Sequence, residues 1–157
     1  MNLVELYSDS SMLLDLQACD KQSANKEMLE YLVDQGRLQK ADVKKALVSI
    51  NNRESQASTG IGKGLAVPHA KNCSFMDGLL GVYGRSGEGI PYESVDGELV
   101  HLVFLVLSCG DTAEDHLDIM KRVASLHRDE KSLRFLATST DPKHITSIFK
   151  ETDEQFS

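Results

Sequence analysis

The sequence predicts an α+β fold in which helices cover both faces of a mixed central sheet, a three-layer α/β/α sandwich. Helical periodicity precedes and follows a run of short apolar segments, so helices should flank the sheet on both sides. The segment from Leu99 to Leu107 is so uniformly apolar that we expect it in the sheet centre. With 157 residues, 41% of them hydrophobic, the chain can bury a core without disulfides or metals. No repeat or linker is visible, so we expect one domain over residues 1–157, with its core at about 3–150.

The first expected elements are a short strand and a helix. Residues 12–16 form an apolar run bounded by polar residues, which is typical of a strand. The helix that follows has Ser23 and Asn25 as candidate N-caps and Gly36 as a left-handed stop. Its apolar residues, spaced i, i+3 and i+4, are Leu29, Leu32 and Val33.

A second helix is indicated by apolar residues at i, i+3, i+4 and i+7, which are Val43, Ala46, Leu47 and Ile50. Asn51 and Asn52 end this pattern. From Arg53 to Gly64 the chain is small, polar and glycine-rich, so we expect a loop there. The loop leads into a short strand at residues 65–67.

Two more strands and three helices complete the expected fold. The strands cover residues 79–83 and 99–107, with turns between them at Gly87, Gly89 and Pro91. The expected helices cover residues 113–127, residues 131–137 and the segment that Asp141 and Pro142 open.

The first of these helices has Asp111 or Thr112 as its cap and a broad apolar face, which implies burial between elements. That face comprises Leu117, Ile119, Met120, Val123, Ala124 and Leu126. In the last helix Asp141 is the N-cap acid and Pro142 occupies the first helical position. We expect the tail from Thr152 to be frayed. The inward-facing residues of that helix are Ile145, Ile148 and Phe149.

Charge and composition narrow the function classes. Lys plus Arg number 17 against 24 Asp plus Glu, and this net charge of -7 opposes binding to nucleic acid or anionic membrane surfaces. Cys19, Cys73 and Cys109 are widely spaced and odd in number, so neither a disulfide framework nor a zinc site is indicated. The chain start lacks a signal-peptide pattern, and no apolar run is long enough to span a bilayer. We therefore expect a cytoplasmic protein without membrane insertion.

The segment from Thr59 to Ala70 is the most unusual in the chain. It places three alternate glycines before a histidine that follows a proline: Gly60, Gly62 and Gly64, then Pro68 and His69. Glycines accept positive φ and let backbone N–H groups approach an anion closely. The proline biases the residue before it toward an extended conformation, which favours a defined orientation for His69. The spacing matches neither the dinucleotide fingerprint nor the phosphate loop, so a plain turn is the alternative.

Two more residues suit an anion site. His116 falls in the first turn of a helix, where the helix dipole favours the neutral imidazole and attracts anions such as phosphate. Arg53 ends the second helix, where a guanidinium could bind an anion at two points. The alternatives are a surface histidine at a helix start and a charge that complements the helix dipole. More ordinary structural or solvated roles are expected for His101, His127, His144 and the thiol of Cys73.

Together these residues resemble the enzyme IIA domain of the fructose, mannitol and nitrogen-regulatory (type 2) branch of the bacterial phosphoenolpyruvate-dependent phosphotransferase system. The resemblance covers roughly residues 3–150. It rests on Arg53–Glu54 at a helix end, the segment from Ser58 to His69, an apolar strand that ends near Leu107, and His116–Leu117 opening a helix. The turn after that strand, Ser108–Cys109–Gly110, differs from the proline-containing turn that is usual in the family.

The resemblance implies a three-layer fold and a phosphotransferase component that needs no metal or organic cofactor. His69 would accept a phosphoryl group from the phosphorylated histidine of an HPr-like carrier and pass it onward. Arg53 would neutralise phosphate charge, and His116 would hydrogen-bond the phosphoryl oxygens. The phosphate pocket would be shaped by Thr59, Gly60, Gly62 and Gly64. The unreactive ring nitrogen of His69 should be held by a hydrogen-bond acceptor, so that the other nitrogen bears the lone pair.

Three functions follow as hypotheses. The first is a histidine phosphocarrier that serves a downstream IIB component or gives a regulatory signal, as in nitrogen-regulatory IIA proteins. The second is a regulatory protein-binding module that is switched by His69 phosphorylation or lacks it. The third is a metal-dependent protein that uses His69, His116 and a cysteine or acid, although no metal-binding spacing is present. Because the chain shows no IIB-like cysteine loop, HPr-like segment or membrane region, we expect a free-standing IIA unit.

Overall fold

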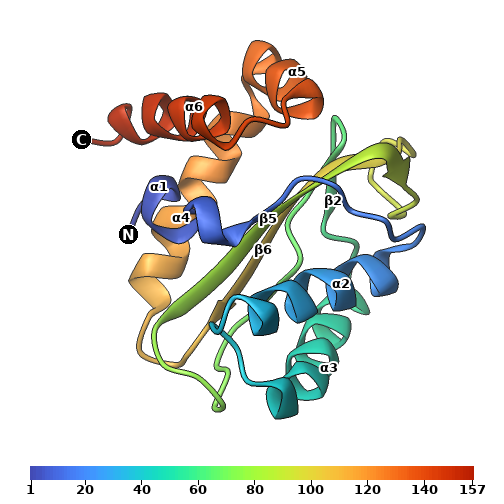
Figure 1. Cartoon of the computed structure of the whole chain (residues 1–157), viewed down its shortest axis with the longest axis vertical. Helices are drawn as coiled ribbons and strands as arrows, with labels where there is room; N and C mark the ends of the chain where they lie inside the picture. The colour runs from blue at the N-terminus through green and yellow to red at the C-terminus, as the bar shows by residue number, and fades with distance from the viewer.

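The computed structural model describes all residues, 1–157, and has six α-helices and a six-stranded sheet (Figure 1). The predicted α+β class with a mixed sheet is confirmed, although the sequence predicts five helices and four strands. In chain order the elements are α1 (Leu3–Leu6), η1 (Asp9–Ser11), β1 (Met12–Leu13), α2 (Lys21–Asp34), η2 (Lys40–Asp42), α3 (Val43–Glu54), β2 (Gly60–Gly62), β3 (Leu65–Ala66), β4 (His69–Ala70), β5 (Leu79–Ile90), β6 (Val100–Ser108), α4 (Ala113–His127), α5 (Glu130–Thr138) and α6 (Pro142–Glu154). No helix is long and apolar enough to cross a membrane.

The sheet is built around the long antiparallel pair β5 and β6. Its strand order is β1-β5-β6-β3-β2, and β4 also pairs with β6, further along that strand than β3. Strand β1 runs parallel to β5, both β3 and β4 run parallel to β6, and β2 is antiparallel to β3. Strand β6 is therefore central, as its uniformly apolar sequence predicts.

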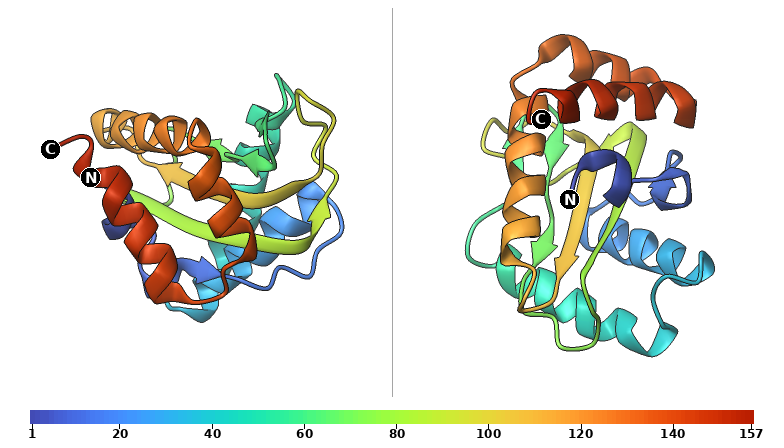
Figure 2. Two further views of the ribbon diagram at one scale, coloured as in Figure 1. Left: turned by 90° about the horizontal axis from the view of Figure 1, so that it is seen from above. Right: turned by 90° about the vertical axis from the view of Figure 1, so that its left-hand side faces the viewer.

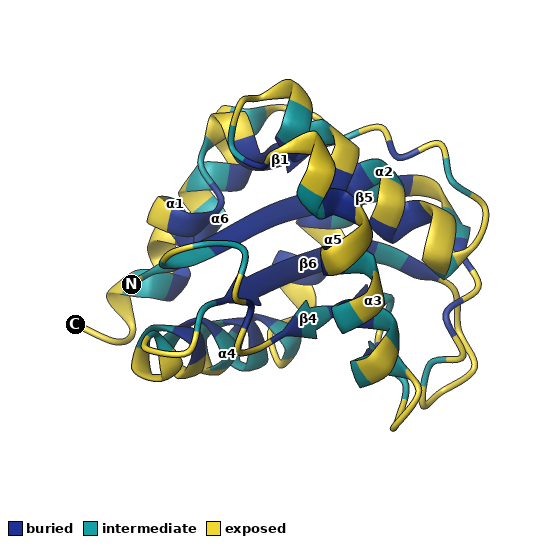
Figure 3. Ribbon diagram, turned by 90° about the horizontal axis from the view of Figure 1, so that it is seen from below, coloured by how far each residue is buried: buried dark blue, intermediate teal, exposed yellow.

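Helices cover both faces of the sheet. Helices α2 and α3 pack on one face, and α1, α4, α5 and α6 pack on the other (Figures 1 and 2). Side chains of β6 alternate between the two cores, because Val103 and Leu105 join the α2–α3 side whereas Leu102 and Phe104 join the opposite side. Figure 3 shows β5 and β6 buried between the helical layers, which confirms the three-layer prediction.

The helix ends mostly follow the expected signals, with one correction. Gly36 adopts a φ of 73° directly after α2, as a left-handed stop requires. The N-cap of α2 is Asp20, whose carboxylate accepts a hydrogen bond from the N–H of Ser23, so the expected caps Ser23 and Asn25 lie inside the helix. Asp141 caps α6 as predicted, with the proline in the first turn.

The strands differ from expectation in four places. Strand β1 ends at Leu13 instead of residue 16, and the short strand β4 is not among the expected strands. The glycine-rich segment contains a real strand, β2, which pairs with β3 to form a hairpin. Strand β5 continues through the expected turn to Ile90, because an irregularity between Arg85 and Ile90 absorbs the glycines, with Gly89 at a φ of 89°.

Two expectations about the later helices are wrong. Leu117 does not join the apolar face of α4, because its side chain is 53% exposed. The tail is not frayed at Thr152, which is buried inside α6. The carboxylate of Asp153 accepts hydrogen bonds from the N–H groups of Leu3 and Val4, which fastens the end of α6 to α1. The two chain ends therefore lie on the same side of the molecule (Figure 1).

Candidate functional site

His69 opens strand β4, which pairs with the C-terminal end of β6, where His69 lies opposite Val106. Its Nδ1 lies 2.7 Å from the carbonyl oxygen of Val67. A carbonyl can only accept, so Nδ1 carries the proton and Nε2 keeps its lone pair. Burial lowers the pKa of His69, and the positive charges of Arg53 and Lys71 lower it further. At neutral pH the side chain is therefore a neutral imidazole with its lone pair on Nε2.

His116 lies in the first turn of α4 and packs against His69. The two rings meet edge to face, with their centroids 5.6 Å apart and an interplanar angle of 71°. His116 is only 2% exposed, and its Nδ1 lies 2.7 Å from the hydroxyl of Ser108. Its Nε2 is buried and has no hydrogen-bond partner in the protein. Burial, then His69 and Lys71, lower the pKa of His116 to about 4, so this ring is also neutral at pH 7.

Arg53 is in the last turn of α3 and lines the two hollows that border His69. One of its terminal nitrogens, Nη1, donates to the carbonyl of Ala57 at 2.9 Å, which directs the guanidinium while leaving other donors free. The larger of the two hollows, about 490 Å³, is polar and is lined by Ser49, Asn52, Arg53, Gln56, His69, Ala70 and Lys71. The neutral ring of His69 thus borders a pocket with two cationic side chains, Arg53 and Lys71.

Thr59 is connected to the end of α3 by Glu54. Its N–H donates to Glu54 Oε2 at 2.8 Å, and its hydroxyl donates to Oε1 at 2.6 Å. The Glu54 side chain is 7% exposed, and Lys21 approaches the same carboxylate at 3.5 Å. On its other side, Thr59 accepts a hydrogen bond from the N–H of Val67, the residue that holds His69. Glu54 and Thr59 therefore join the helix end that carries Arg53 to the chain that carries His69.

The three glycines divide into one near the site and two far from it. Gly60 pairs with Ala66, and a Cβ there would come within 2.5 Å of the hydroxyl of Ser94. Gly62 and Gly64 have φ angles of 95° and 77° and form the tight part of the hairpin. The carbonyl of Gly64 accepts from the N–H of Leu102, at the opposite end of β6 from the histidine pair.

The pairing of β3 and β4 with β6 gives the distance between the hairpin glycines and His69. His69 pairs with Val106, four positions along β6 from Leu102, which is about 13 Å at the rise of a strand. The structure therefore brings together His69, His116, Arg53 and Thr59, and Gly60 directly follows Thr59 in the chain. It holds Gly62 and Gly64 apart from His69 and His116, in the tight part of the hairpin, where their carbonyls accept hydrogen bonds from His127 and His101.

Three further site residues escape prediction from the sequence. Lys71 lines the pocket two positions after His69, and the two-residue period of a strand is a signal that could have found it. Glu54 stands out only as the neighbour of Arg53, and its bonds to Thr59 cross a loop. Ser108 reaches His116 from the end of β6, and no sequence pattern marks that contact.

The remaining histidines and the cysteines of the chain form no second reactive or metal-binding site. His101 bonds the carbonyl of Ser86, and His127 bonds the carbonyl of Gly62, so both hold the main chain. No group of three or more His, Cys, Asp or Glu side chains is arranged to hold a metal ion. The cysteines are unpaired at positions Cys19, Cys73 and Cys109.

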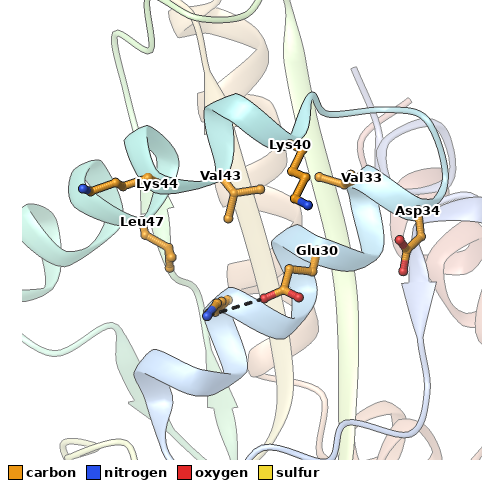
Figure 4. A pocket seen from close by; sticks show the side chains of 8 residues that line it. Glu30, Val33, Asp34, Lys40, Val43, Lys44 and Leu47 are labelled. Carbon is orange, nitrogen blue, oxygen red and sulfur yellow. Dashed lines mark ion pairs between the residues drawn. The ribbon is translucent and has the colours of Figure 1, made fainter.

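A surface hollow of about 690 Å³ lies between α2 and α3 (Figure 4), and neither His69 nor His116 lines it. Its rim carries an ion pair between Lys26 and Glu30 with atoms 3.9 Å apart. It contains no histidine, cysteine or hydroxyl nucleophile, since its lining residues are Lys26, Glu30, Val33, Asp34, Lys40, Val43, Lys44 and Leu47. This hollow therefore offers no imidazole, thiol or hydroxyl side chain that could accept a transferred group.

Known proteins resemble this chain in sequence and in fold. Residues 5–152 match the family described as "Phosphoenolpyruvate-dependent sugar phosphotransferase system, EIIA 2". The chain belongs to this family. It is a phosphotransfer component of that system, and from here we call it the EIIA domain.

Relatives of the EIIA domain include sugar-specific and regulatory proteins. The fructose-specific EIIABC component of Bacillus subtilis (strain 168) is 33% identical over 154 residues, which cover 98% of this chain but only 24% of the Bacillus protein. The EIIA domain thus spans about a quarter of that relative. A nitrogen regulatory protein of Bradyrhizobium diazoefficiens is 30% identical over 148 residues, which cover 94% of both chains.

Solved structures agree with the fold. The crystal structure of the nitrogen regulatory protein IIA-Ntr from Neisseria meningitidis superposes with a TM-score of 0.81 at 25% identity, covering 92% of this chain and 97% of that one. The mannitol enzyme IIA of Escherichia coli, determined in complex with phosphorylated enzyme IIB, gives a TM-score of 0.76 at 18% identity. That match covers 92% of this chain and 96% of the other, and it is a similarity of fold.

Proposed function

We propose that the EIIA domain carries a phosphoryl group on Nε2 of His69, which it accepts from the phosphohistidine of an HPr-like carrier. One observation carries this proposal: two neutral imidazoles lie in edge-to-face contact, and one of them has its lone pair on Nε2. A neutral imidazole is a competent nucleophile, and transfer through a loose in-line transition state needs mainly positioning and charge stabilisation.

The transfer balances without a cofactor. The Nε2 lone pair of His69 forms a bond to phosphorus while the bond between phosphorus and the donor's imidazole nitrogen breaks, and the donor ring keeps that electron pair. Phosphorylation leaves His69 with substituents on both nitrogens and a positive ring, which the carbonyl of Val67 stabilises through the Nδ1 proton. Transfer to the next acceptor reverses these steps.

Two side chains are suited to the charge that develops on the phosphoryl oxygens. Arg53 lines both hollows beside His69 and has guanidinium donors left over from its bond to Ala57. His116 has a buried Nε2 without a protein partner, and a phosphoryl oxygen would give it one. Lys71, two residues after the nucleophile, adds positive charge on the same side.

The phosphoryl acceptor is a IIB component or a regulatory target protein. The Escherichia coli mannitol IIA was determined with phosphorylated IIB, which supports the first, and the nitrogen regulatory relatives support the second. A pull-down from cell extract with unmodified and phosphorylated EIIA domain separates them. Capture of a IIB-like protein supports relay to transport, and capture of a different protein in only one phosphorylation state supports regulation.

The proposal is tested by intact-mass measurement after incubation with phosphoenolpyruvate, enzyme I and HPr. We expect one phosphate on the wild type, lost after mild acid, and none on His69→Ala. Full labelling of His69→Ala would overturn the site assignment. No labelling of the wild type would favour a protein-binding module that keeps the fold without the chemistry.

A further inference from the structure

The buried side chain of Ser108 contacts His116 at Nδ1, one of the two nitrogens of the imidazole ring. Ser108 is the last residue of β6 and is 2% exposed. Its hydroxyl lies 2.7 Å from His116 Nδ1, and that atom is its only hydrogen-bond partner. The other ring nitrogen of His116, Nε2, is buried and unpaired. The state of Nε2 therefore depends on which atom carries the proton between Ser108 and Nδ1.

Two arrangements of that proton are available. If the Nδ1–H of His116 donates to Ser108, the serine hydroxyl proton has no acceptor. In that case Nε2 carries a lone pair that receives no hydrogen bond, so two buried groups are unpaired. If the hydroxyl of Ser108 instead donates to Nδ1, only the Nε2–H of His116 lacks a hydrogen-bond partner. Because unpaired buried polar groups destabilise a fold, the second arrangement is favoured.

We propose that Ser108 is a positioning residue that fixes His116 as the Nε2–H tautomer, so that His116 meets the phosphoryl group on His69 as a hydrogen-bond donor. This inference rests on the proposed function of the histidine pair. The two rings would then have opposite tautomers. Val67 makes Nε2 of His69 a lone pair, and Ser108 makes Nε2 of His116 a donor.

The tautomer matters because His116 is a neutral ring with a single N–H. A phosphoryl oxygen only accepts hydrogen bonds, so a lone pair on Nε2 would repel it. A protonated ring would donate from both nitrogens and would need no serine. The lowered pKa of His116, caused first by burial and then by His69 and Lys71, removes that possibility at neutral pH.

The segment between Ser108 and His116 is held in place by the main chain. The carbonyl of Ser108 accepts from the N–H of Cys73 at 2.9 Å, and the N–H of Cys109 donates to the carbonyl of Gly78 at 3.1 Å. The N–H of His116 itself donates to the carbonyl of Thr112. These bonds fix the serine at the strand end and the histidine in the first helical turn, so their contact does not depend on a mobile loop.

Long-range ¹H–¹⁵N NMR of the unphosphorylated EIIA domain at pH 7 tests the proposal directly. We expect His116 as the Nε2–H tautomer and His69 as the Nδ1–H tautomer in the wild type. Ser108→Ala should give His116 a mixture of tautomers and leave His69 unchanged, and Ser108→Thr should restore the wild-type pattern. Ser86→Ala removes another buried serine hydroxyl, which accepts from Gly89, and should leave both histidines unchanged.

Transfer from phosphorylated HPr provides the second readout. We expect Ser108→Ala to slow transfer about tenfold, with unchanged affinity for HPr, and Ser108→Thr to recover most of the rate. The inference would be overturned if the wild type carried the proton of His116 on Nδ1. It would also be overturned if His116 in the Ser108→Ala variant kept the wild-type tautomer. If the wild type accepts no phosphate, the proposed function fails, whereas the NMR spectra still decide the tautomer.

Discussion

The hydroxyl of Thr59 lies 2.6 Å from a carboxylate oxygen of Glu54, and the N–H of Thr59 lies 2.8 Å from the other oxygen of the same group. This two-point contact crosses the loop between α3 and β2. It links Glu54, which follows Arg53, to Thr59, whose carbonyl accepts a hydrogen bond from the N–H of Val67. Arg53 and His69 are thus held relative to each other by one buried carboxylate, that of Glu54.

Replacing that acid should weaken both fold and transfer. Glu54→Gln removes the negative charge from two hydrogen bonds, each worth about 1.5–3 kcal/mol when charged, and we expect on the order of 2 kcal/mol less stability. Urea denaturation measures this loss, and phosphoryl transfer should slow as Arg53 moves. Glu30→Gln, on the exposed side of α2, is the control and should change neither. Wild-type stability of Glu54→Gln would contradict the role of this contact.

Arg53→Ala should change both the rate and the titration of His69. Loss of one guanidinium at the phosphoryl oxygens should slow transfer about 100-fold, as for other electrostatic donors. Because the charge of Arg53 lowers the pKa of His69, its removal should raise that pKa, which an NMR titration of the ring measures. Arg53→Lys keeps the positive charge but lacks the paired N–H donors of the guanidinium. This variant should therefore keep the pKa of His69 low and still transfer the phosphoryl group slowly. An unchanged pKa in Arg53→Ala would show that the guanidinium does not act on His69.

Stability should fall on mild acidification because of the buried histidines. The pKa of His116 is lowered from 6.5 to about 4, so between these values the unfolded chain binds a proton that the folded chain does not. Stability is full above about pH 7 and declines as pH falls from 6.5 toward 4, by up to about 3 kcal/mol. Lowering of the pKa of His69 acts in the same direction.

Urea denaturation of the wild type and His116→Gln at pH 7, 5.5 and 4.5 measures this effect. The variant should lose less stability over this range, and His144→Gln, at an exposed helix start, should behave as the wild type. Parallel pH profiles for wild type and His116→Gln would contradict the buried, neutral state of this ring.

Leu117 should belong to the surface that meets a partner protein. It follows His116 directly, and its side chain is 53% exposed, so it offers an apolar contact beside the proposed transfer site. Leu117→Asp should leave stability unchanged and weaken binding to HPr about tenfold, which calorimetry can measure. Val95→Asp changes a residue that is 77% exposed near the hairpin of Gly62, and its affinity should match the wild type. Equal affinities for Leu117→Asp and the wild type would remove Leu117 from the docking surface.

Much of the fold follows from local patterns that burial enforces. The apolar run of β6 requires cover on both faces, and Asp141 with its following proline marks a helix start by hydrogen bonding and fixed φ alone. Strand β2 escapes such reasoning because its three residues, Gly-Ile-Gly, form a strand only through pairing with β3. The extension of β5 to Ile90 likewise depends on its partner β6.

The candidate site divides in the same way. His69, His116 and Arg53 are marked by motif and by helix ends, and the fold brings them together. Glu54 and Ser108 act through contacts across a loop and across a strand end, which no local pattern encodes. The distant position of Gly62 and Gly64 also appears only with the register of β3 on β6.

The position of the phosphoryl group on the ring is the most direct test of the central proposal. Long-range ¹H–¹⁵N NMR of the EIIA domain phosphorylated by phosphoenolpyruvate, enzyme I and HPr should show the group on Nε2 of His69, with Nδ1 still protonated and bonded to Val67. A phosphoryl group on Nδ1 of His69, or on any other residue, would contradict it.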